Sequence, residues 1–593
     1  MNLIRSLTTI CFVLPLASAG SVDELFRVAL PGGVAGQLRA EGFDVFCVEP
    51  LELVVNAAEL KQLRDRGLFP DVLEVGRPFA EIQAERQAAR QAEEEAAVPA
   101  GYADLAAIKA ALFAAEASRP DICTIVDLTA LYGASPTFEG RHLLAAKISD
   151  NVGLDEDEPR VLLVSNHHAR EIVTPVIALN AITQLLAGHG SDPDITAIID
   201  GTEIWVAPVW NPDGYVEVFV GNNLWRKNRR VLPGGIGVDL NRNYPVGWGQ
   251  GCGGSTSPSS STYEGPRSAS EPETQTMMAL SADRRFAKVI DFHSSGQEVR
   301  FGYGCWSHPL DAYFGLEATR LSTAMGYAGN IGSSCCLAGD IHLHTATTGS
   351  LAFLPETATE FQPSFALAQA EAAQVWSGIL YFLKRAIPVT GHVTDLCTGL
   401  PLAADLTVVG LALENGEVNG SDGDTGRYHS WLPGGPWTLR FSAPGYVTRD
   451  VSATVTSGSL QLDVALVPSG DGSWLDVGGG VAGSLGLPAL VGAGQPCAGQ
   501  VVSVTLSDAT PNAPATLVLG LSQVDVLFKG GVLVPSPDLL VSGLLTDGGG
   551  QLVIGGVWPA SAPVGSQIWL QYWVVDGSAP QGLSGSNGLQ VDG

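Results

Sequence analysis

Positive charge is scarce in this sequence of 593 residues. It has 32 Lys and Arg against 61 Asp and Glu, which gives a formal net charge of −29. Because binding to a phosphate backbone needs a basic face, this imbalance argues against a nucleic-acid partner. The simplest interpretation of the negative charge is a well-hydrated surface that resists aggregation.

A long apolar run is also missing beyond the first residues. No stretch after residue 19 is long enough to cross a bilayer, so we expect no membrane span. Residues 1–19 have the pattern of a secretory signal peptide, with Arg5 at the basic end, an apolar centre at residues 10–16 and small residues at the cleavage site. We therefore predict a secreted, extracellular protein.

Cysteine is sparse, with nine residues in the whole chain. One of them, Cys11, falls within the predicted signal peptide. The other eight would meet a compartment in which disulfides persist. Cys252 and Cys305 both fall in predicted loops near the candidate site described below, and we predict that they pair, although spacing alone does not determine connectivity.

The chain is too long for one hydrophobic core, and its patterns divide it into several domains. Residues 20–79 alternate short strand and helix patterns and predict a small α+β unit. Residues 80–101, rich in Ala, Glu, Gln and Arg, predict a helical, solvated connector. Residues 102–388 predict an α/β domain with a mixed sheet covered on both faces. Residues 389–467 and 473–593 show short alternating runs with turns, which predict two all-β sandwich domains.

One stretch of the α/β domain combines a strand pattern with metal-binding side chains. Residues 161–164 form an apolar run that predicts a buried strand, and a helical pattern follows. His168 and Glu171 lie at the change, and on a helical turn their spacing would put both side chains on one face, about 5–6 Å apart at Cβ. A catalytic zinc has three protein ligands and an open position. His293 directly follows another predicted strand, at residues 288–292, and sites in such sheets form at the carboxyl ends of strands.

These residues belong to an ordered series of motifs in the chain. The series includes Phe138-Glu139-Gly140-Arg141, His168-x-x-Glu171, Asn211-Pro212-Asp213-Gly214-Tyr215, Arg226-Lys227-Asn228, Asp239-Leu240-Asn241-Arg242, Asp291-Phe292-His293, Pro355-Glu356-Thr357 and Phe361-Gln362-Pro363. In this order it resembles the zinc metallocarboxypeptidases of the carboxypeptidase A/B type, over about residues 102–388. The resemblance implies a peptidase that removes amino acids from the free C-terminus of peptides or proteins.

The resemblance also implies a cofactor and a reaction. His168, Glu171 and His293 would bind one Zn²⁺. Glu356 matches the family's catalytic carboxylate, which would take a proton from a zinc-activated water and pass it to the leaving amine. Glu360 is a nearby competitor for this role. We prefer Glu356 because Phe361-Gln362-Pro363 downstream matches the segment that follows the family's catalytic glutamate.

Four further polar residues match family positions that bind the substrate. Arg226 resembles the arginine that polarises the scissile carbonyl and stabilises the oxyanion. Asn241 and Arg242 resemble the pair that binds the terminal carboxylate, for which a planar guanidinium is well suited. Arg170, inside the metal motif, resembles a further substrate-binding arginine.

The resemblance also concerns the specificity pocket and two tyrosine positions. It implies that the floor of the pocket lies near Ile341, which would favour apolar or aromatic C-terminal side chains, or near Asp340, which would favour Lys or Arg. Between them we favour Ile341. Ser295 and the region of Ser334 occupy positions where the family has tyrosines, and this departure concerns turnover and specificity more than the mechanism.

Three other histidines are predicted to lie outside the ligand set. His167 should point away from the ligand face and lie either behind it or in solvent. His342 and His344 form a His-x-His pair in a loop-like stretch, a pattern that is more often incidental than metal-binding.

The flanking domains resemble known accessory domains less specifically. Residues 20–79 are similar to the ferredoxin-like inhibitory prosegments of such enzymes, and the connector to a cleavage region. Residues 389–467 are similar to the transthyretin-like domain of regulatory carboxypeptidases, whereas residues 473–593 suggest a β module linked to the cell surface or to secretion. Two rival hypotheses are a related zinc amidohydrolase acting on cell-wall peptides and a catalytically impaired surface-binding protein.

Overall fold

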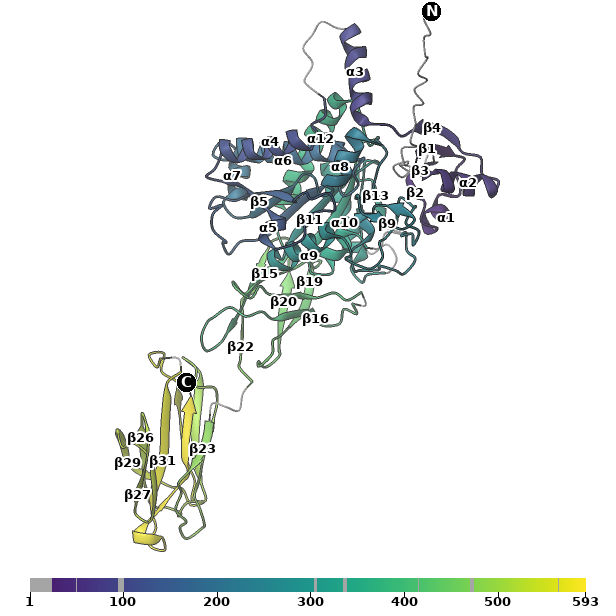
Figure 1. The fold of residues 1–593 in the computed structure, drawn as a ribbon. Coiled ribbons are helices and arrows are strands. Elements are labelled where there is room, and N and C mark those ends of the chain that lie inside the picture. Colours follow the sequence, from purple (N-terminus) through teal and green to yellow (C-terminus); the bar gives the residue numbers. More distant parts are fainter. Residues whose placement is uncertain are drawn as a thin grey trace, which may run out of the picture. The chain divides into compact units, whose positions relative to one another are not determined.

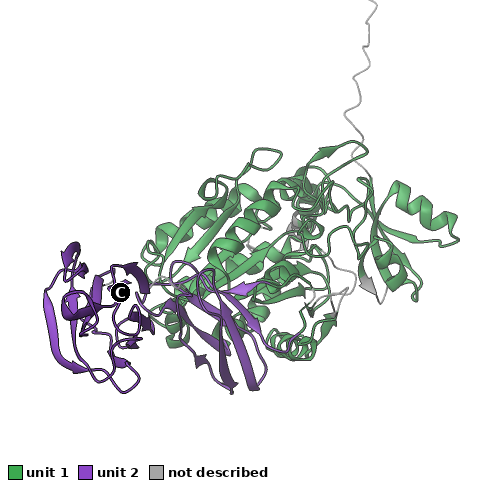
Figure 2. Cartoon of the chain, turned by 90° about the horizontal axis from the view of Figure 1, so that it is seen from below, with its two compact units in different colours: residues 1–385, 412–417 green, residues 386–411, 418–593 purple. Residues whose placement is uncertain are grey.

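The computed structural model of the chain describes residues 24–48, 51–93, 101–302, 307–333, 339–413, 415–469, 474–563 and 565–592. It divides the chain into two compact units, residues 1–385 with 412–417 and residues 386–411 with 418–593 (Figure 2). The predicted signal peptide, Cys305 and Ser334 lie outside the described residues, so the predictions that rest on them stay predictions. None of the helices among the described residues combines the length and the hydropathy that a bilayer span requires.

Unit 1 begins with an antiparallel four-stranded sheet in the order β2-β3-β1-β4. Its elements are β1 (Leu25–Leu30), α1 (Ala35–Ala40), β2 (Asp44–Val48), β3 (Leu51–Asn56), α2 (Ala57–Asp65) and β4 (Asp71–Val75), and α3 (Phe79–Glu93) follows. Asn56 begins α2 with a capping box, because its side-chain oxygen accepts from the N–H of Glu59 and the Glu59 carboxylate accepts from the N–H of Asn56. We call residues 24–75 the N-terminal sheet unit.

The rest of unit 1 is built on an eight-stranded mixed sheet in the order β13-β12-β14-β11-β7-β8-β6-β5. The strands are β5 (Cys123–Asp127), β6 (Leu144–Ile148), β7 (Arg160–Ser165), β8 (Glu203–Ala207), β11 (Lys288–Ser294), β12 (Glu298–Phe301), β13 (Ile331–Ser333) and β14 (Leu351–Thr357). The four central strands β14, β11, β7 and β8 are parallel, and antiparallel neighbours flank them on both sides. Strands β7, β8 and β11 are buried along their whole length, as the apolar runs at residues 161–164 and 288–292 predicted for β7 and β11.

Helices cover both faces of this sheet (Figure 1). They are α4 (Leu105–Ser118), α5 (Leu128–Leu131), α6 (Val173–Gly188), α7 (Pro193–Ile199), α8 (Pro212–Val220), α9 (Pro272–Arg284), α10 (Asp311–Ala324), α11 (Ile341–Ala346) and α12 (Phe365–Lys384), with a 3₁₀ turn at Leu240–Arg242 and a short hairpin of β9 (Val231–Leu232) and β10 (Gly235–Ile236). One buried cluster joins α4, α6 and α12 through Ile108, Val173 and Ala368. A second joins strand residues such as Leu162 to Met277 of α9. The predicted α/β class is confirmed.

Unit 2 consists of short strands in several small sheets. Its first part contains β15 (Val389–Asp395), β16 (Asp405–Val408), β17 (Asn419–Gly420), β18 (Arg427–Ser430), β19 (Gly435–Ser442), β20 (Arg449–Val455), β21 (Leu460–Gln461) and β22 (Val464–Leu466), in two sheets. Its second part contains β23 (Trp474–Gly478), β24 (Ala489–Ala493), β25 (Val501–Ser507), β26 (Pro514–Gly520), β27 (Gln523–Phe528), β28 (Gly531–Pro535), β29 (Leu539–Leu545), β30 (Leu552–Val557), β31 (Gln567–Val575), a 3₁₀ turn (Pro580–Gly582), β32 (Leu583–Gly585) and β33 (Gly588–Asp592). Alternating inward side chains such as Leu506 and Tyr572 form its core.

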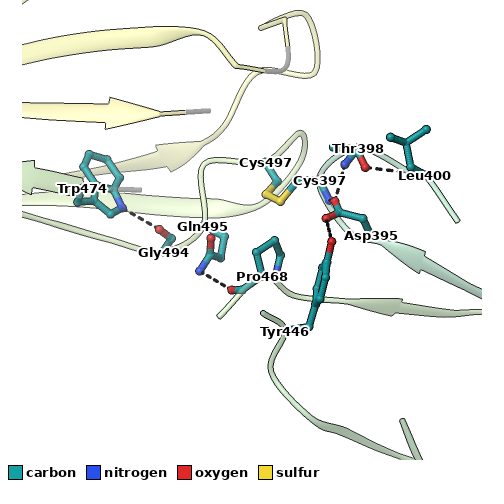
Figure 3. Close-up of a disulfide and its surroundings, with 10 residues drawn as sticks. All are labelled: Asp395, Cys397, Thr398, Leu400, Tyr446, Pro468, Trp474, Gly494, Gln495 and Cys497. Atoms are coloured by element: carbon teal, nitrogen blue, oxygen red, sulfur yellow. Dashed lines mark hydrogen bonds between the residues drawn. A yellow bond between two sulfur atoms is a disulfide. The ribbon is translucent and has the colours of Figure 1, made fainter. Parts of the chain in front are cut away.

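A disulfide joins the two parts of unit 2, between Cys397 and Cys497 (Figure 3). This pair was not predicted. The loop that carries Cys397 is held by Asp395, whose carboxylate accepts from the N–H of Cys397 at 2.7 Å and from the hydroxyl of Tyr446 at 2.7 Å. Each half of the disulfide therefore belongs to a different all-β region of the same unit.

Candidate active site

The three predicted metal ligands lie together at the carboxyl ends of β7 and β11. The Nδ1 atom of His168 is 2.8 Å from Oε1 of Glu171. The Nδ1 atom of His293 is 3.0 Å from Nδ1 of His168 and 3.0 Å from Oε2 of Glu171. All three side chains are buried, and one ligand atom from each lies within 4.8 Å of the others.

The segment that carries His168 and Glu171 is a turn, not the start of a helix. Asn166 has a φ of 62°, and its side-chain amide donates to the carbonyl oxygens of His168 at 3.1 Å and Ala169 at 3.2 Å. Asparagine tolerates this left-handed conformation and bonds locally to the backbone. The predicted helical turn is therefore wrong, because α6 begins only at Val173. The turn nevertheless brings the two side chains together, since the N–H of Glu171 donates to the carbonyl oxygen of His168.

A buried carboxylate faces the second ring nitrogen of each imidazole. Oδ2 of Asp291 is 2.6 Å from Nε2 of His293, and Oδ1 of Asp239 is 3.3 Å from Nε2 of His168. A carboxylate in this position fixes the ring and its tautomer, so that Nδ1 keeps its lone pair for a metal. Two such nitrogens and one carboxylate that converge on one point fit a zinc ion.

Both supporting carboxylates are held in their ionised form. Burial alone would raise the pKa of Asp239, but Arg226 and His168 lower it well below its usual range. Burial opposes ionisation of Asp291 too, yet His167 and His293 lower its pKa below the ordinary value. The negative charge that each imidazole needs behind it is therefore present.

His167 is buried behind the ligands and is not exposed. Its Nδ1 atom is 2.8 Å from Oδ1 of Asp291, and its Nε2 atom is 3.1 Å from the hydroxyl of Tyr244. His167, Asp291 and His293 form a second group whose ligand atoms lie close together. In that group, however, Asp291 already accepts from both imidazoles, so we assign it to holding His293 in place.

Glu356 lies beside the ligands on the neighbouring strand. In the parallel register of β11 and β14 it is opposite His293. A Cβ atom on Gly296 would lie 3.2 Å from the Cβ of Glu356, so a glycine there leaves room for the carboxylate. Burial raises the pKa of Glu356, while Arg300 and His293 act in the opposite direction. Glu360, the alternative, is exposed and does not line the cleft.

The predicted substrate-binding residues surround the same cleft. It is lined, among others, by His168, Arg170, Glu171, Arg226, Asn241, Arg242, His293 and Glu356. Nε and Nη2 of Arg226 both donate to Oδ2 of Asp239, at 3.0 and 2.9 Å. Arg242 donates to the carbonyl oxygens of Gly253 at 3.1 Å and Asn241 at 2.6 Å. These bonds fix the orientation of both guanidinium groups.

Ile341 does not line this cleft. Its side chain is fully buried and is not among the described residues that line the cleft. Its N–H donates to Oδ1 of Asn241 at 3.1 Å, so its backbone supports the cleft from behind. Asp340 begins α11, where its carboxylate accepts from the N–H of Leu343 and lies 3.1 Å from Nδ1 of His342. His344 stacks on the ring of Tyr244 and, like His342, lies outside the ligand set.

An acidic side chain of the N-terminal sheet unit enters the cleft. Oδ2 of Asp44, at the start of β2, is 2.6 Å from Nη2 of Arg170, and Oδ1 is 3.4 Å from Nη1 of Arg226. All three side chains are buried. The Arg170 guanidinium also lies 4.3 Å from the centre of the Phe361 ring, and burial lowers its pKa. The sequence patterns alone had given no role to Asp44.

Sequence reasoning also gave no role to Asp239, Asp291 and Arg300. For Asp291 the sequence held a usable pattern, because it lies two residues before His293 on the same strand, and residues two apart on a strand point to the same face. Asp239 precedes the 3₁₀ turn at Leu240–Arg242, so no strand pattern marks it.

Known proteins are similar to the region of the chain that contains the candidate site. Residues 108–377 match the family model of the zinc carboxypeptidases. The chain is 35% identical over 184 residues to a metallocarboxypeptidase A from Trichophyton rubrum, covering 30% of this chain and 43% of that protein. It is 32% identical over 260 residues to a carboxypeptidase A2 from Rattus norvegicus, covering 42% of this chain and 58% of that protein. The chain thus spans about half the length of these curated relatives.

A solved structure shares the fold. The crystal structure of a carboxypeptidase A from Helicoverpa armigera matches with a TM-score of 0.50 at 23% sequence identity, covering 60% of this chain and 96% of that chain. At this identity the likeness concerns the fold alone.

Proposed function

We propose that the chain, whose residues 108–377 match the family model of the zinc carboxypeptidases, is a secreted zinc-dependent exopeptidase that removes single amino acids from the C-terminus of peptides. The observation that carries this proposal is the convergence of two imidazole Nδ1 atoms and one carboxylate, with Glu356 on the adjacent strand. A zinc ion bound there would supply a Lewis acid and lower the pKa of water towards ~7.

Glu356 is the proposed proton carrier. Its carboxylate would accept a proton from the attacking water as the oxygen–carbon bond forms, and would deliver that proton to the amine nitrogen as the carbon–nitrogen bond breaks. Its burial raises its pKa towards the range in which a carboxylate can both take and return a proton. General acid–base catalysis of this kind contributes about 10²–10⁴-fold.

The arginines and Asn241 would bind and orient the peptide. Asp239 holds Arg226 through Nε and Nη2, and Nη1 faces the cleft, where Asp44 now lies. A substrate carbonyl oxygen would take that position, because a fixed cation there stabilises the negative charge that develops. Asn241 and Arg242 would bind the terminal carboxylate, and Arg170 would add a second cation on the Arg226 side.

The N-terminal sheet unit would keep the enzyme latent. Asp44 pairs with two arginines to which we assign substrate, so a peptide and this unit cannot both occupy the cleft. The unit is also held by Asn56, whose amide donates to the carbonyl oxygen of Ser259 at 2.7 Å, and by Glu74, which accepts from Asn223 at 2.7 Å. Cleavage in the connector after α3 would release it.

The test is digestion of a peptide library that varies at the C-terminus, with purified protein before and after limited proteolysis. Single residues should leave from the carboxyl end, a chelator should stop the release, and a C-terminal amide should protect the peptide. Release of internal fragments would contradict the roles of Asn241 and Arg242. Cleavage of cell-wall peptides alone would favour the amidohydrolase hypothesis, and zinc binding without any cleavage would favour the surface-binding protein.

A further inference from the structure

Arg300, on β12, is a cation of the cleft that the proposed reaction does not use. Its side chain is 10% exposed and lines the cleft together with Arg242 and Glu356. Its Nε donates to Oε1 of Glu298 at 2.9 Å, and its Nη2 lies 3.4 Å from Oε1 of Glu356. The guanidinium is thus held in one place between two carboxylates.

The strand register puts Arg300 one row deeper than the proposed proton carrier. In the antiparallel pair of β12 and β14, Glu298 is opposite Glu356 and Arg300 is opposite Leu354. Opposite residues, and residues two apart on a strand, point to the same face of a sheet. Both rows therefore face the cleft, about 6.6–6.8 Å apart along the strands. An extended acidic side chain that starts beside Glu356 can cover this spacing.

The fixed charge of the cleft favours an anionic occupant. Outside the N-terminal sheet unit, four arginines (Arg170, Arg226, Arg242 and Arg300) line it against two carboxylates (Glu171 and Glu356), in a chain whose net charge is −29. The acidic side chain that the N-terminal sheet unit places among them is Asp44. A peptide that replaces that unit would bind Arg242 through its terminal carboxylate. It would also meet a further cation, Arg300, in the deeper row.

The other two candidates for the specificity pocket are less well placed. Ile341 does not line the described part of the cleft, so it offers no apolar wall to the substrate there. The carboxylate of Asp340 is fully buried and already accepts from the N–H of Leu343. Of the three, Arg300 is the residue whose charged group borders the cleft.

We propose that Arg300 is a specificity-determining residue that directs the enzyme to peptides ending in glutamate or aspartate. The guanidinium binds the side-chain carboxylate of the last residue while Asn241 and Arg242 bind its α-carboxylate. Glu298 keeps the guanidinium oriented. The proposal rests on the carboxypeptidase function proposed above and names its substrate class.

The experiment compares blocked peptides that are identical except for their last residue, which is Glu, Asp, Gln, Leu, Phe or Lys. Glutamine is the critical comparison, because it has the shape of glutamate without the charge. The protease-treated full chain should release Glu faster than Gln by about 10- to 100-fold in kcat/KM, the range expected of a charge-assisted hydrogen bond. Arg300→Met should bring this ratio close to one, and Arg300→Lys should retain most of it.

The ratio isolates binding of the last side chain from other effects. Arg300 also contacts Glu356, so its loss can change the chemical step, but that change applies equally to the Glu and Gln peptides and cancels. The Glu-to-Gln ratio is likewise independent of the fraction of folded protein. Arg320→Met, which removes an arginine on α10 paired with Glu317, is the matched control and should leave the ratio unchanged.

Two results would overturn the proposal. One is faster release of Leu, Phe, Lys or Gln than of Glu and Asp by the unaltered protein. The other is a Glu-to-Gln ratio that stays the same in Arg300→Met. The absence of chelator-sensitive release from every peptide would instead overturn the carboxypeptidase function itself, so the two failures are distinguishable.

Discussion

Replacing Asp44 by asparagine should partly activate the unprocessed chain. The substitution keeps the shape of the side chain but removes the charge that pairs with Arg170 and Arg226. A hydrogen bond to a charged group contributes about 1.5–3 kcal/mol, and breaking a buried ion pair costs about 3–5 kcal/mol. Since the second contact of Asp44 is long at 3.4 Å, we expect docking of the N-terminal sheet unit to weaken by about 3 kcal/mol.

This change corresponds to roughly 100-fold in the docking equilibrium. If the docked form predominates, the activity of the unprocessed Asp44→Asn protein should rise by a similar factor. Its upper limit is the activity of the protease-treated protein. The assay is release of C-terminal residues before and after limited proteolysis, in low salt. High salt should reduce the difference only slightly, because the pair is buried.

Asp71→Asn is the matched control. Asp71 lies on β4 of the same sheet unit, where it is exposed to solvent. The substitution removes the same charge at a position that does not touch the cleft. The unprocessed Asp71→Asn protein should therefore be as inactive as the unaltered chain. The reasoning would be refuted if Asp44→Asn were equally inactive before proteolysis while proteolysis activated both variants fully.

The remaining predictions concern the chemistry and the stability of the chain. Glu356→Gln should lower kcat by about 10²–10⁴-fold with unchanged zinc per chain by mass spectrometry, and loss of zinc would contradict its role as proton carrier. Burial raises the pKa of Glu273 to about 8, so the folded chain keeps this proton while the unfolded chain loses it, and stability falls as pH rises from about 4.5 towards 8. Glu273→Gln should therefore raise the free energy of unfolding by about 2–4 kcal/mol at pH 9 but by little at pH 4; an equal gain at both would be contrary to this account. Replacing Cys397 and Cys497 by serine should lower the stability of unit 2 by about 2–4 kcal/mol in denaturant titrations, and no loss would mean that the bond closes no flexible loop.

The sequence predicted the site best where function follows directly from buried strands. The apolar runs at residues 161–164, 288–292 and 351–354 are central parallel strands, and the polar residues just beyond them meet at one edge of the sheet. His293 and Glu356 are neighbours for this reason. The hydrophobic pattern of each run was sufficient to predict its strand, and a parallel sheet brings the carboxyl ends of neighbouring strands together.

Local propensity misled or was silent where backbone geometry decides. The Val-, Tyr- and Phe-rich stretch at Pro212–Val220 has the composition of a strand, but Asn211 accepts from the N–H of Gly214 and the proline fits the first helical turn, so a helix forms. At Asn166 a single left-handed residue replaces the expected helical turn.

Contacts between segments far apart in the sequence could not be predicted at all. Asp44 and Arg226 are 182 residues apart, and their pairing depends on how a separately folded sheet docks. The two halves of the Cys397–Cys497 disulfide are 100 residues apart. The place of Arg300 in the cleft required the register of β12 against β14, which neither strand specifies alone.

The most direct test of the metal centre is X-ray diffraction from crystals of the purified protein, measured on both sides of the zinc absorption edge. We predict one anomalous peak per chain, between Nδ1 of His168, the carboxylate of Glu171 and Nδ1 of His293, with Glu356 beside it. A peak at another cluster, such as the acidic group around Asp150, with none at these three residues would contradict the account.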